Sequence, residues 1–236
     1  MTRPPTVLLV HGAHHGAWCW DEVRTRLPFR TEAVDLPLTS YADDTDTVRD
    51  AVRQAALHGP VLLVAHSYGG LPVSSAGHAA DRLVYIAARM PRPDESPAAL
   101  TPHWNTPGFH EVVKESDDGT LTLLPGAREI LYSGTPAPYA RQAAARWRPM
   151  RSRVPDTPLR DPAWLSVPSA YVVCADDRTV RPEAQRTCAA HACARLELPC
   201  DHSPFYSAPD ELARFLGEQA ALITRVTCTG STGPTR

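Results

Sequence analysis

A serine between small residues follows an apolar, strand-like run in the first third of the chain. Residues 61–64 (Val-Leu-Leu-Val) lead into Ala-His-Ser-Tyr-Gly-Gly at 65–70, and the sequence beyond is compatible with a helix. A tight strand-to-helix turn holds its serine in a strained conformation, so only small residues fit two positions to either side. The hydroxyl then stands at the N-terminus of a helix, whose dipole favours developing negative charge. The pattern predicts that Ser67 is a nucleophile.

A histidine and an acid that could activate this serine follow in the second half of the chain. The apolar run at 168–175 ends at Asp176 and Asp177, and the run at 195–200 is followed closely by His202. Groups that follow parallel strands gather at one edge of the sheet. A histidine that removes the serine proton, held by a carboxylate, is the arrangement for nucleophilic attack on a carbonyl carbon.

The elements that must position these residues alternate between strand and helix. Six strand-like runs recur, most of them continuous apolar stretches, at about 6–11, 31–36, 61–66, 82–88, 168–175 and 195–200. Continuous apolar strands are typical of a parallel sheet covered on both faces. An apolar stripe predicts a helix over 43–58 with acids at its start, and a last helix begins at Pro209. We therefore predict an α/β fold with a doubly wound, mostly parallel sheet of about six strands.

Residues 90–165 interrupt this alternation. Prolines exclude long helices early in the segment, and 129–148 offers one or two helices. We interpret the segment as a small cap inserted into a single domain that spans residues 1–223, whereas the polar tail at 224–236 is expected to be disordered. Aromatic residues gather in the cap, and we expect Trp104 and Trp147 to line an apolar pocket while most other rings attach the cap to the core.

Composition limits the classes of function. The 236 residues carry a formal net charge of −2, which gives no electrostatic case for binding nucleic acid or an anionic membrane. The six cysteines show no metal-ligand spacing, and no apolar stretch is long enough for a membrane span or a signal peptide. We predict a cytoplasmic protein that acts on a small molecule without cofactor or metal, and a homodimer is compatible with the sequence.

A third motif lies near the N-terminus. The run at 7–10 ends in His-Gly-Ala-His-His-Gly-Ala-Trp at 11–18, and Asp-His-Ser-Pro-Phe follows at 201–205. With the serine turn and the chain order Ser…Asp…His, these motifs resemble the α/β-hydrolase superfamily. The resemblance is to the branch of plant methylesterases, including the salicylate-binding protein, hydroxynitrile lyases and bacterial esterase-like relatives. It covers about 5–220 and is weakest in the cap.

The resemblance implies further site residues. The acid of the family stands five residues before a proline, a spacing that Asp177 has to Pro182 and that favours it over Asp176. The family's oxyanion hole corresponds to the backbone amides of Ala13 and Tyr68.

Two positions separate hydrolases from lyases within this branch. In the lyases a threonine follows the first histidine and a lysine follows the catalytic histidine, whereas this chain has Gly12 and Ser203. Neither residue supplies a comparable group, so the resemblance implies ester cleavage, with both residues at the substrate pocket. His14 and His15 lack a third metal ligand with suitable spacing, so we expect His15 to brace the oxyanion loop and His14 to border the pocket.

These observations predict a serine hydrolase that cleaves a small, fairly apolar carboxylic ester, such as a methyl ester, through an acyl-enzyme. Two alternatives remain at this point. The first is a non-hydrolytic enzyme of the same fold, a lyase, cyclase or isomerase in a bacterial natural-product pathway. The second is a small-ligand receptor with a vestigial triad. Turnover of an ester panel distinguishes the three.

Overall fold

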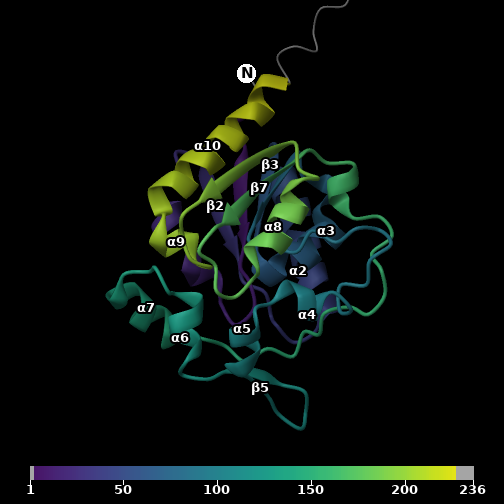
Figure 1. Ribbon diagram of the computed structural model, residues 1–236. Coiled ribbons are helices and arrows are strands. Elements are labelled where there is room, and N and C mark those ends of the chain that lie inside the picture. The colour runs from purple at the N-terminus through teal and green to yellow at the C-terminus, as the bar shows by residue number, and fades with distance from the viewer. Residues whose placement is uncertain (1–2, 227–236) are drawn as a thin grey trace, which may run out of the picture.

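A six-stranded parallel sheet forms the centre of the molecule (Figure 1). The computed structural model describes residues 3–226. The strand order is β2-β1-β3-β4-β7-β8, with bounds β1 Thr6–Val10, β2 Arg30–Val34, β3 Val61–His66, β4 Arg82–Ile86, β7 Ser169–Cys174 and β8 Ala194–Leu198. The inner strands β1, β3 and β7 are buried along their whole length, as their continuous apolar sequences require. The predicted doubly wound parallel sheet is confirmed.

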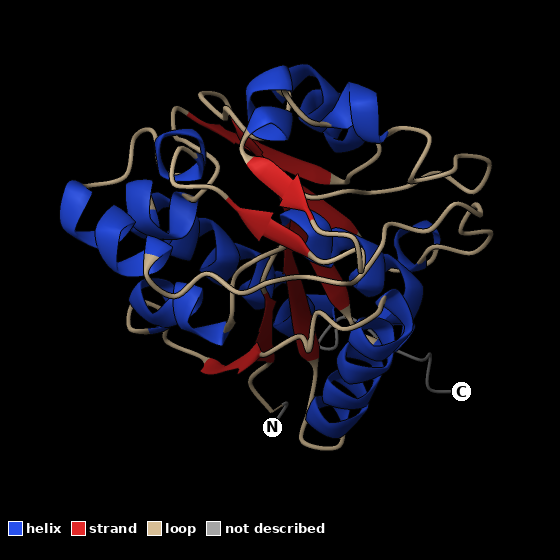
Figure 2. Ribbon diagram, turned by 90° about the horizontal axis from the view of Figure 1, so that it is seen from below, coloured by secondary structure: helices blue, strands red, loops and turns tan. Residues whose placement is uncertain are grey.

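Helices cover both faces of this sheet (Figure 2). On one face the core includes residues of α2 (Tyr41–Ala56), α3 (Gly70–Ala76) and α8 (Pro182–Ala189). On the other face it includes residues of α1 (Asp21–Arg24), α9 (Pro204–Ser207) and α10 (Pro209–Val226). None of the helices within residues 3–226 has both the length and the apolar character needed to cross a bilayer.

The end of α10 corrects one expectation from the sequence. The helix continues to Val226, so the predicted tail does not begin at Thr224. The rest of that tail, residues 227–236, lies outside the described part of the chain.

The segment between β4 and β7 lies beyond the carboxyl ends of the strands, below the sheet in Figure 1. It contains α4 (Thr101–Trp104), α5 (Pro107–Glu111), the antiparallel pair β5 (Val113–Glu115) and β6 (Leu121–Leu123), α6 (Ala127–Leu131) and α7 (Ala137–Ala144). The hairpin was not predicted, although Asp118-Gly119 is a common turn signal and Gly119 has a φ of 78°. Short 3₁₀ helices complete the fold at Ala17–Trp20, Ser67–Gly69, Gly77–Ala79 and Ala163–Leu165.

Candidate active site

Ser67 occupies a strained turn at the end of β3. Its φ is +51°, in the left-handed region that side-chain-bearing residues rarely adopt, at a typical cost of about 1–3 kcal/mol. The next turn of chain packs so closely that a Cβ on Gly69 would lie 2.6 Å from the carbonyl oxygen of His11, and one on Gly70 would lie 2.2 Å from that of Arg89. The Arg89 amide also donates to the Ser67 carbonyl at 3.2 Å. These contacts hold the serine in its strained conformation.

The side chains of Ser67, His202 and Asp177 form one continuous hydrogen-bonded chain. The imidazole Nε2 of His202 lies 3.1 Å from Ser67 Oγ, and its Nδ1 lies 2.7 Å from Asp177 Oδ2. A carboxylate only accepts hydrogen bonds, so the proton of the neutral imidazole is on Nδ1. The lone pair of Nε2 is then directed at the serine hydroxyl, as a general base requires.

The Asp177 carboxylate accepts four hydrogen bonds, whereas its neighbour Asp176 is exposed. Oδ1 accepts from the amides of Thr179 at 2.7 Å and Val180 at 2.9 Å. Oδ2 accepts from Gln185 Nε2 at 2.8 Å in addition to His202. The geometry therefore brings Asp177, and not Asp176, to the histidine.

Gln185 is a site residue that the sequence interpretation missed. It is fully buried on α8, and its Oε1 accepts from the Cys174 amide at 2.8 Å while its Nε2 donates to Asp177. This side chain links the end of β7 to the carboxylate. The sequence signal for this role was a glutamine on the inward face of α8, the helix that follows Asp177.

The loop after β1 brings Ala13 to the serine. Ala13 and Tyr68 line the same cavity as Ser67. His14 has a φ of 62°, its Nδ1 donates to the Arg148 carbonyl at 3.0 Å, and its own carbonyl accepts from the Arg148 amide at 2.9 Å. This reciprocal pair fixes the loop against the segment that follows α7.

His14 and His15 diverge, as expected for adjacent residues in a loop. His15 Nδ1 donates to the Ala13 carbonyl at 2.8 Å, so its Nε2 accepts the Tyr132 hydroxyl proton at 2.9 Å. Burial lowers the pKa of His15 to about 3 and also lowers the pKa of His14, so both rings are neutral near pH 7. Residues 3–226 contain no cluster of three His, Cys, Asp or Glu side chains arranged for a metal ion.

A second buried network supports the serine turn from the opposite side. The sequence interpretation gave the acids at the start of α2 a role at the helix dipole. Asp44 is instead fully buried, where it accepts from the Leu38 amide at 2.8 Å and from the hydroxyls of Tyr68 at 2.7 Å and Ser152 at 2.6 Å. It thereby ties the residue after Ser67 to the chain that returns from the cap.

A cavity of about 570 Å³ opens at the serine. Two predicted pocket residues, His14 and Trp104, line it, as do Ser67 and His202. Its other lining residues include Arg89, Phe109, Leu131, Met150, Val154 and Thr179.

Three predicted pocket residues are not on this cavity wall. Gly12 has no side chain and packs against the serine turn, where a Cβ would lie 2.8 Å from the Ser67 Cβ. Trp147 Nε1 donates to the Tyr132 hydroxyl at 3.1 Å, outside the cavity. Ser203 is fully buried, and its hydroxyl donates to the Leu131 carbonyl at 3.0 Å.

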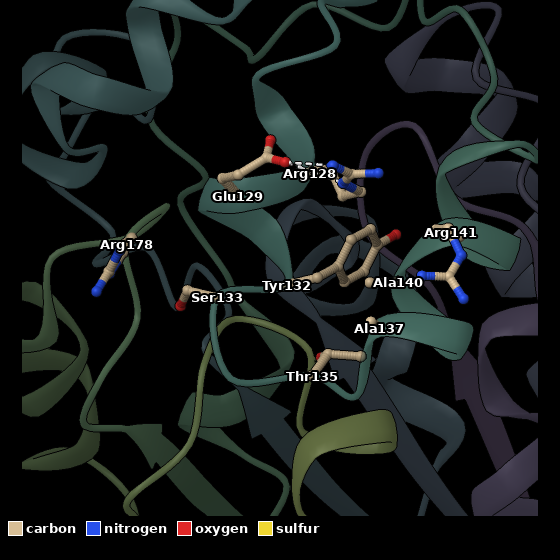
Figure 3. A pocket seen from close by; sticks show the side chains of 9 residues that line it. All are labelled: Arg128, Glu129, Tyr132, Ser133, Thr135, Ala137, Ala140, Arg141 and Arg178. Carbon is tan, nitrogen blue, oxygen red and sulfur yellow. Dashed lines mark hydrogen bonds and ion pairs between the residues drawn. The ribbon is translucent and has the colours of Figure 1, made fainter.

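Another hollow, of about 350 Å³, lies between the α6–α7 region of the cap and Arg178 of the loop after β7 (Figure 3). Figure 3 shows the Tyr132 ring near its centre, an ion pair between Arg128 and Glu129 above it, and Arg178 and Arg141 on opposite sides of the ring. Neither Ser67 nor His202 lines it. The cavity at the serine is therefore the candidate active site.

Comparisons with known proteins agree with the fold described above. Residues 7–215 match the sequence profile of the alpha/beta hydrolase family. Methylesterase 1 of Arabidopsis thaliana is 25% identical over 250 residues, covering 90% of this chain and 95% of that protein. A pyrethroid hydrolase of Sphingobium wenxiniae is 27% identical over 247 residues, covering 91% and 87%. The crystal structure of a pyrethroid hydrolase from Sphingobium faniae has the same fold, with a TM-score of 0.78 at 23% identity and coverage of 94% and 99%.

Proposed function

Because this chain belongs to the alpha/beta hydrolase family and is a carboxylic-ester hydrolase, we propose that it cleaves its ester through an acyl-enzyme on Ser67. The observation that carries the proposal is the unbroken hydrogen-bonded chain from Ser67 through His202 to Asp177. The names of the similar proteins, a methylesterase and a pyrethroid hydrolase, support ester cleavage.

The proposed reaction has two proton transfers at one atom. His202 Nε2 removes the Ser67 proton as Oγ attacks the ester carbonyl, and the same nitrogen then protonates the departing alcohol. The Asp177 carboxylate stabilises the imidazolium that exists between these events. Water then attacks the acyl-enzyme while His202 Nε2 removes its proton. The same nitrogen returns the proton to Ser67 Oγ as the carboxylic acid is released. The amides of Ala13 and Tyr68 would stabilise the oxyanion, each contributing about 10²–10³ in rate.

The cavity wall favours a small substrate with an apolar portion. Trp104, Phe109, Leu131 and Met150 supply apolar surface near the serine. We propose a small, fairly apolar carboxylic ester, with methyl esters as the first class to examine.

Covalent labelling combined with turnover tests this proposal. The wild-type protein should hydrolyse p-nitrophenyl acetate or members of a methyl-ester panel and should react with a fluorophosphonate at Ser67, as mass spectrometry of the labelled peptide would show. Ser67→Ala should abolish both activities. Persistence of labelling in this variant would reject Ser67 as the nucleophile. A wild-type protein that shows neither turnover nor labelling would instead support the non-hydrolytic alternative.

The two adjacent acids provide a matched pair for the same assay. Asp177→Asn should lower kcat by about 10³–10⁴-fold, because an amide cannot hold the imidazole in the tautomer that accepts the serine proton. Asp176→Asn removes the same charge one residue away and should leave kcat within about threefold, since that side chain is exposed. The reverse result would assign the role to Asp176.

A further inference from the structure

Arg89 is a buried cation on the wall of the active-site cavity. It follows β4, the residue is 8% exposed, and it lines the same cavity as Ser67 and His202. Its Nη1 donates to the Pro97 carbonyl at 2.6 Å and its Nη2 to Thr101 Oγ1 at 3.0 Å. The guanidinium Cζ lies 5.4 Å from the centre of the Trp104 ring. All of these partners are neutral.

No carboxylate within residues 3–226 pairs with this guanidinium. Arg89 also lines a second cavity, whose acids Glu95 and Glu183 pair with Arg92 and Arg186. On the active-site cavity wall, Glu115 pairs with Arg153. The other acid on the cavity wall, Asp156, is exposed to solvent. Burial lowers the pKa of Arg89 to about 10, which leaves it charged at neutral pH.

Two hydrogen bonds to neutral acceptors do not explain why a charged guanidinium is buried at this position. Removing an unpaired ion from water is strongly unfavourable, and proteins pair such groups or place them where a ligand completes them. A neutral donor could reach Pro97 and Thr101 without that penalty. The arginines around the pocket in Figure 3 differ, because Arg128, Arg141 and Arg178 are exposed and water can solvate them.

The guanidinium also has unused donors. It has five N–H bonds, and within the described chain two of them have protein acceptors. The planar, forked arrangement of such donors matches the two oxygens of a carboxylate. The Trp104 ring near the guanidinium adds a cation–π contact.

We propose that Arg89 binds a free carboxylate of the substrate, so that the ester cleaved at Ser67 carries a second, ionised carboxyl group. A half-ester of a dicarboxylic acid is the simplest member of this class. The proposal rests on the ester hydrolysis proposed above and narrows its substrate: an apolar stretch separates the scissile ester from an anionic end.

Charge balance favours a carboxylate over a phosphate at this position. One carboxylate neutralises one guanidinium, whereas a phosphate monoester brings a charge of about −1.5 to −2 at pH 7. No second buried arginine or lysine lines this cavity within residues 3–226. Arg153 is exposed and paired with Glu115, and His110 is exposed. Burial lowers the pKa of His14, and His202 is bonded to Ser67 and Asp177.

The test compares charged and neutral esters on the same protein preparation. Monomethyl succinate, glutarate, adipate and pimelate are each paired with the neutral methyl ester of matched chain length, and acetyl esters of hydroxy acids place the charge on the alcohol side. The wild-type protein should prefer one charged series. Arg89→Met should lower kcat/KM for the preferred charged ester by about 10²-fold, because it truncates one partner of a buried charge pair. The fall should appear in the ratio of kcat/KM for the charged ester to kcat/KM for the matched neutral ester. The ratio of the two values does not depend on the folded fraction of the variant.

Two further variants complete the experiment. Arg89→Lys keeps the charge but loses the forked pair of N–H donors. Its preference for charged over neutral esters should therefore fall between those of the wild type and Arg89→Met. Arg141→Met is the matched control, because Arg141 is exposed and lines the other hollow rather than the active-site cavity, and the preference should be unchanged. An equal preference for charged esters in the wild type and Arg89→Met would overturn the proposal.

Binding separates this proposal from the hydrolysis itself. Calorimetry on Ser67→Ala should show that monomethyl glutarate binds more tightly than its neutral counterpart, and that adding Arg89→Met removes the difference. Binding of this kind without turnover by the wild type would retain the role of Arg89 and reject the hydrolase. If the wild type hydrolyses neutral esters and Arg89→Met changes neither turnover nor binding of the charged esters, the hydrolase would be retained and the role of Arg89 rejected.

Discussion

Hydrogen-bond direction gives each polar atom at the active site one role. The donor and acceptor of the Gln185 amide are divided between Asp177 and the end of β7. The carboxylate of Asp177 uses both oxygens as acceptors, so His202 Nδ1 is a donor and the lone pair of Nε2 faces the Ser67 hydroxyl, as the proposed role of a base requires. Gln185 therefore acts through Asp177 as a positioning residue, without contacting the cavity.

Replacing Gln185 should affect turnover more than substrate binding. Gln185→Met keeps much of the volume but removes the donor to Asp177 Oδ2, so the carboxylate loses a restraint on its orientation. We expect kcat to fall by about 10–100-fold and KM to change by no more than about threefold, as in the loss of a supporting shell around a reacting group. Steady-state kinetics on the best p-nitrophenyl ester measures both values. A parallel rise in KM without a fall in kcat would assign Gln185 to substrate binding instead.

At the scale of elements, the active site depends on how closely α3 approaches the strands. The first residue of α3, Gly70, packs against the backbone of Arg89, just beyond β4, and Gly69 packs against that of His11, just beyond β1. This approach places the serine at the carboxyl edge of the sheet, beside the loops that carry Ala13 and His202. The same approach explains why Arg89, whose amide bonds the Ser67 carbonyl, enters the cavity wall.

Glycine substitutions in two helices test this close approach. Gly70→Ala would place a Cβ 2.2 Å from a backbone oxygen that cannot move independently, so we expect a loss of at least about 3 kcal/mol in the free energy of unfolding. Gly217→Ala in α10 is the matched control, because its Cβ would meet no atom closer than 3.9 Å. That change should stabilise the protein by about 0.5–1 kcal/mol through helix propensity. Urea denaturation measures both, and a neutral Gly70→Ala would contradict the packing described here.

The sequence predicted the elements that depend on local pattern and missed those that depend on packing. The four inner strands could be found because both sheet faces are covered there and their sequences are almost continuously apolar, whereas the edge strands β2 and β8 have fewer apolar residues and are only partly buried. The β5–β6 hairpin has strands of only three residues, too short for a periodic signal. Trp147 was expected in the pocket, but its indole bonds Tyr132 within the cap, a contact that local sequence does not encode. Arg89 was missed because it ends an apolar run and its burial arises from the fold around it.

At the scale of the whole molecule, three buried histidines make the fold sensitive to acid. His14, His15 and His66 are each at most 3% exposed. Burial lowers the pKa of all three below the ordinary value of 6.5, to about 3 for His15 and well below that value for His66. The folded state therefore holds these rings neutral in a pH range where the unfolded chain would protonate them.

The sign of the pH dependence follows from this difference in proton binding. Below about pH 6.5 the unfolded chain takes up protons that the folded protein does not, so the free energy of unfolding falls as the pH falls. Each histidine contributes up to about 1.4 kcal/mol per pH unit between its two pKa values, and none of this loss is present well above about pH 6.5. Urea denaturation between about pH 7.5 and pH 5 should therefore show a steep decline in the free energy of unfolding.

His15→Gln should reduce that slope by up to about 1.4 kcal/mol per pH unit, even though it destabilises the protein at neutral pH by removing the ring from its contacts with Trp18 and Phe205. Equal slopes in the wild type and the variant would mean that His15 is protonated in the folded state, which would contradict the hydrogen bond that its Nε2 accepts from Tyr132.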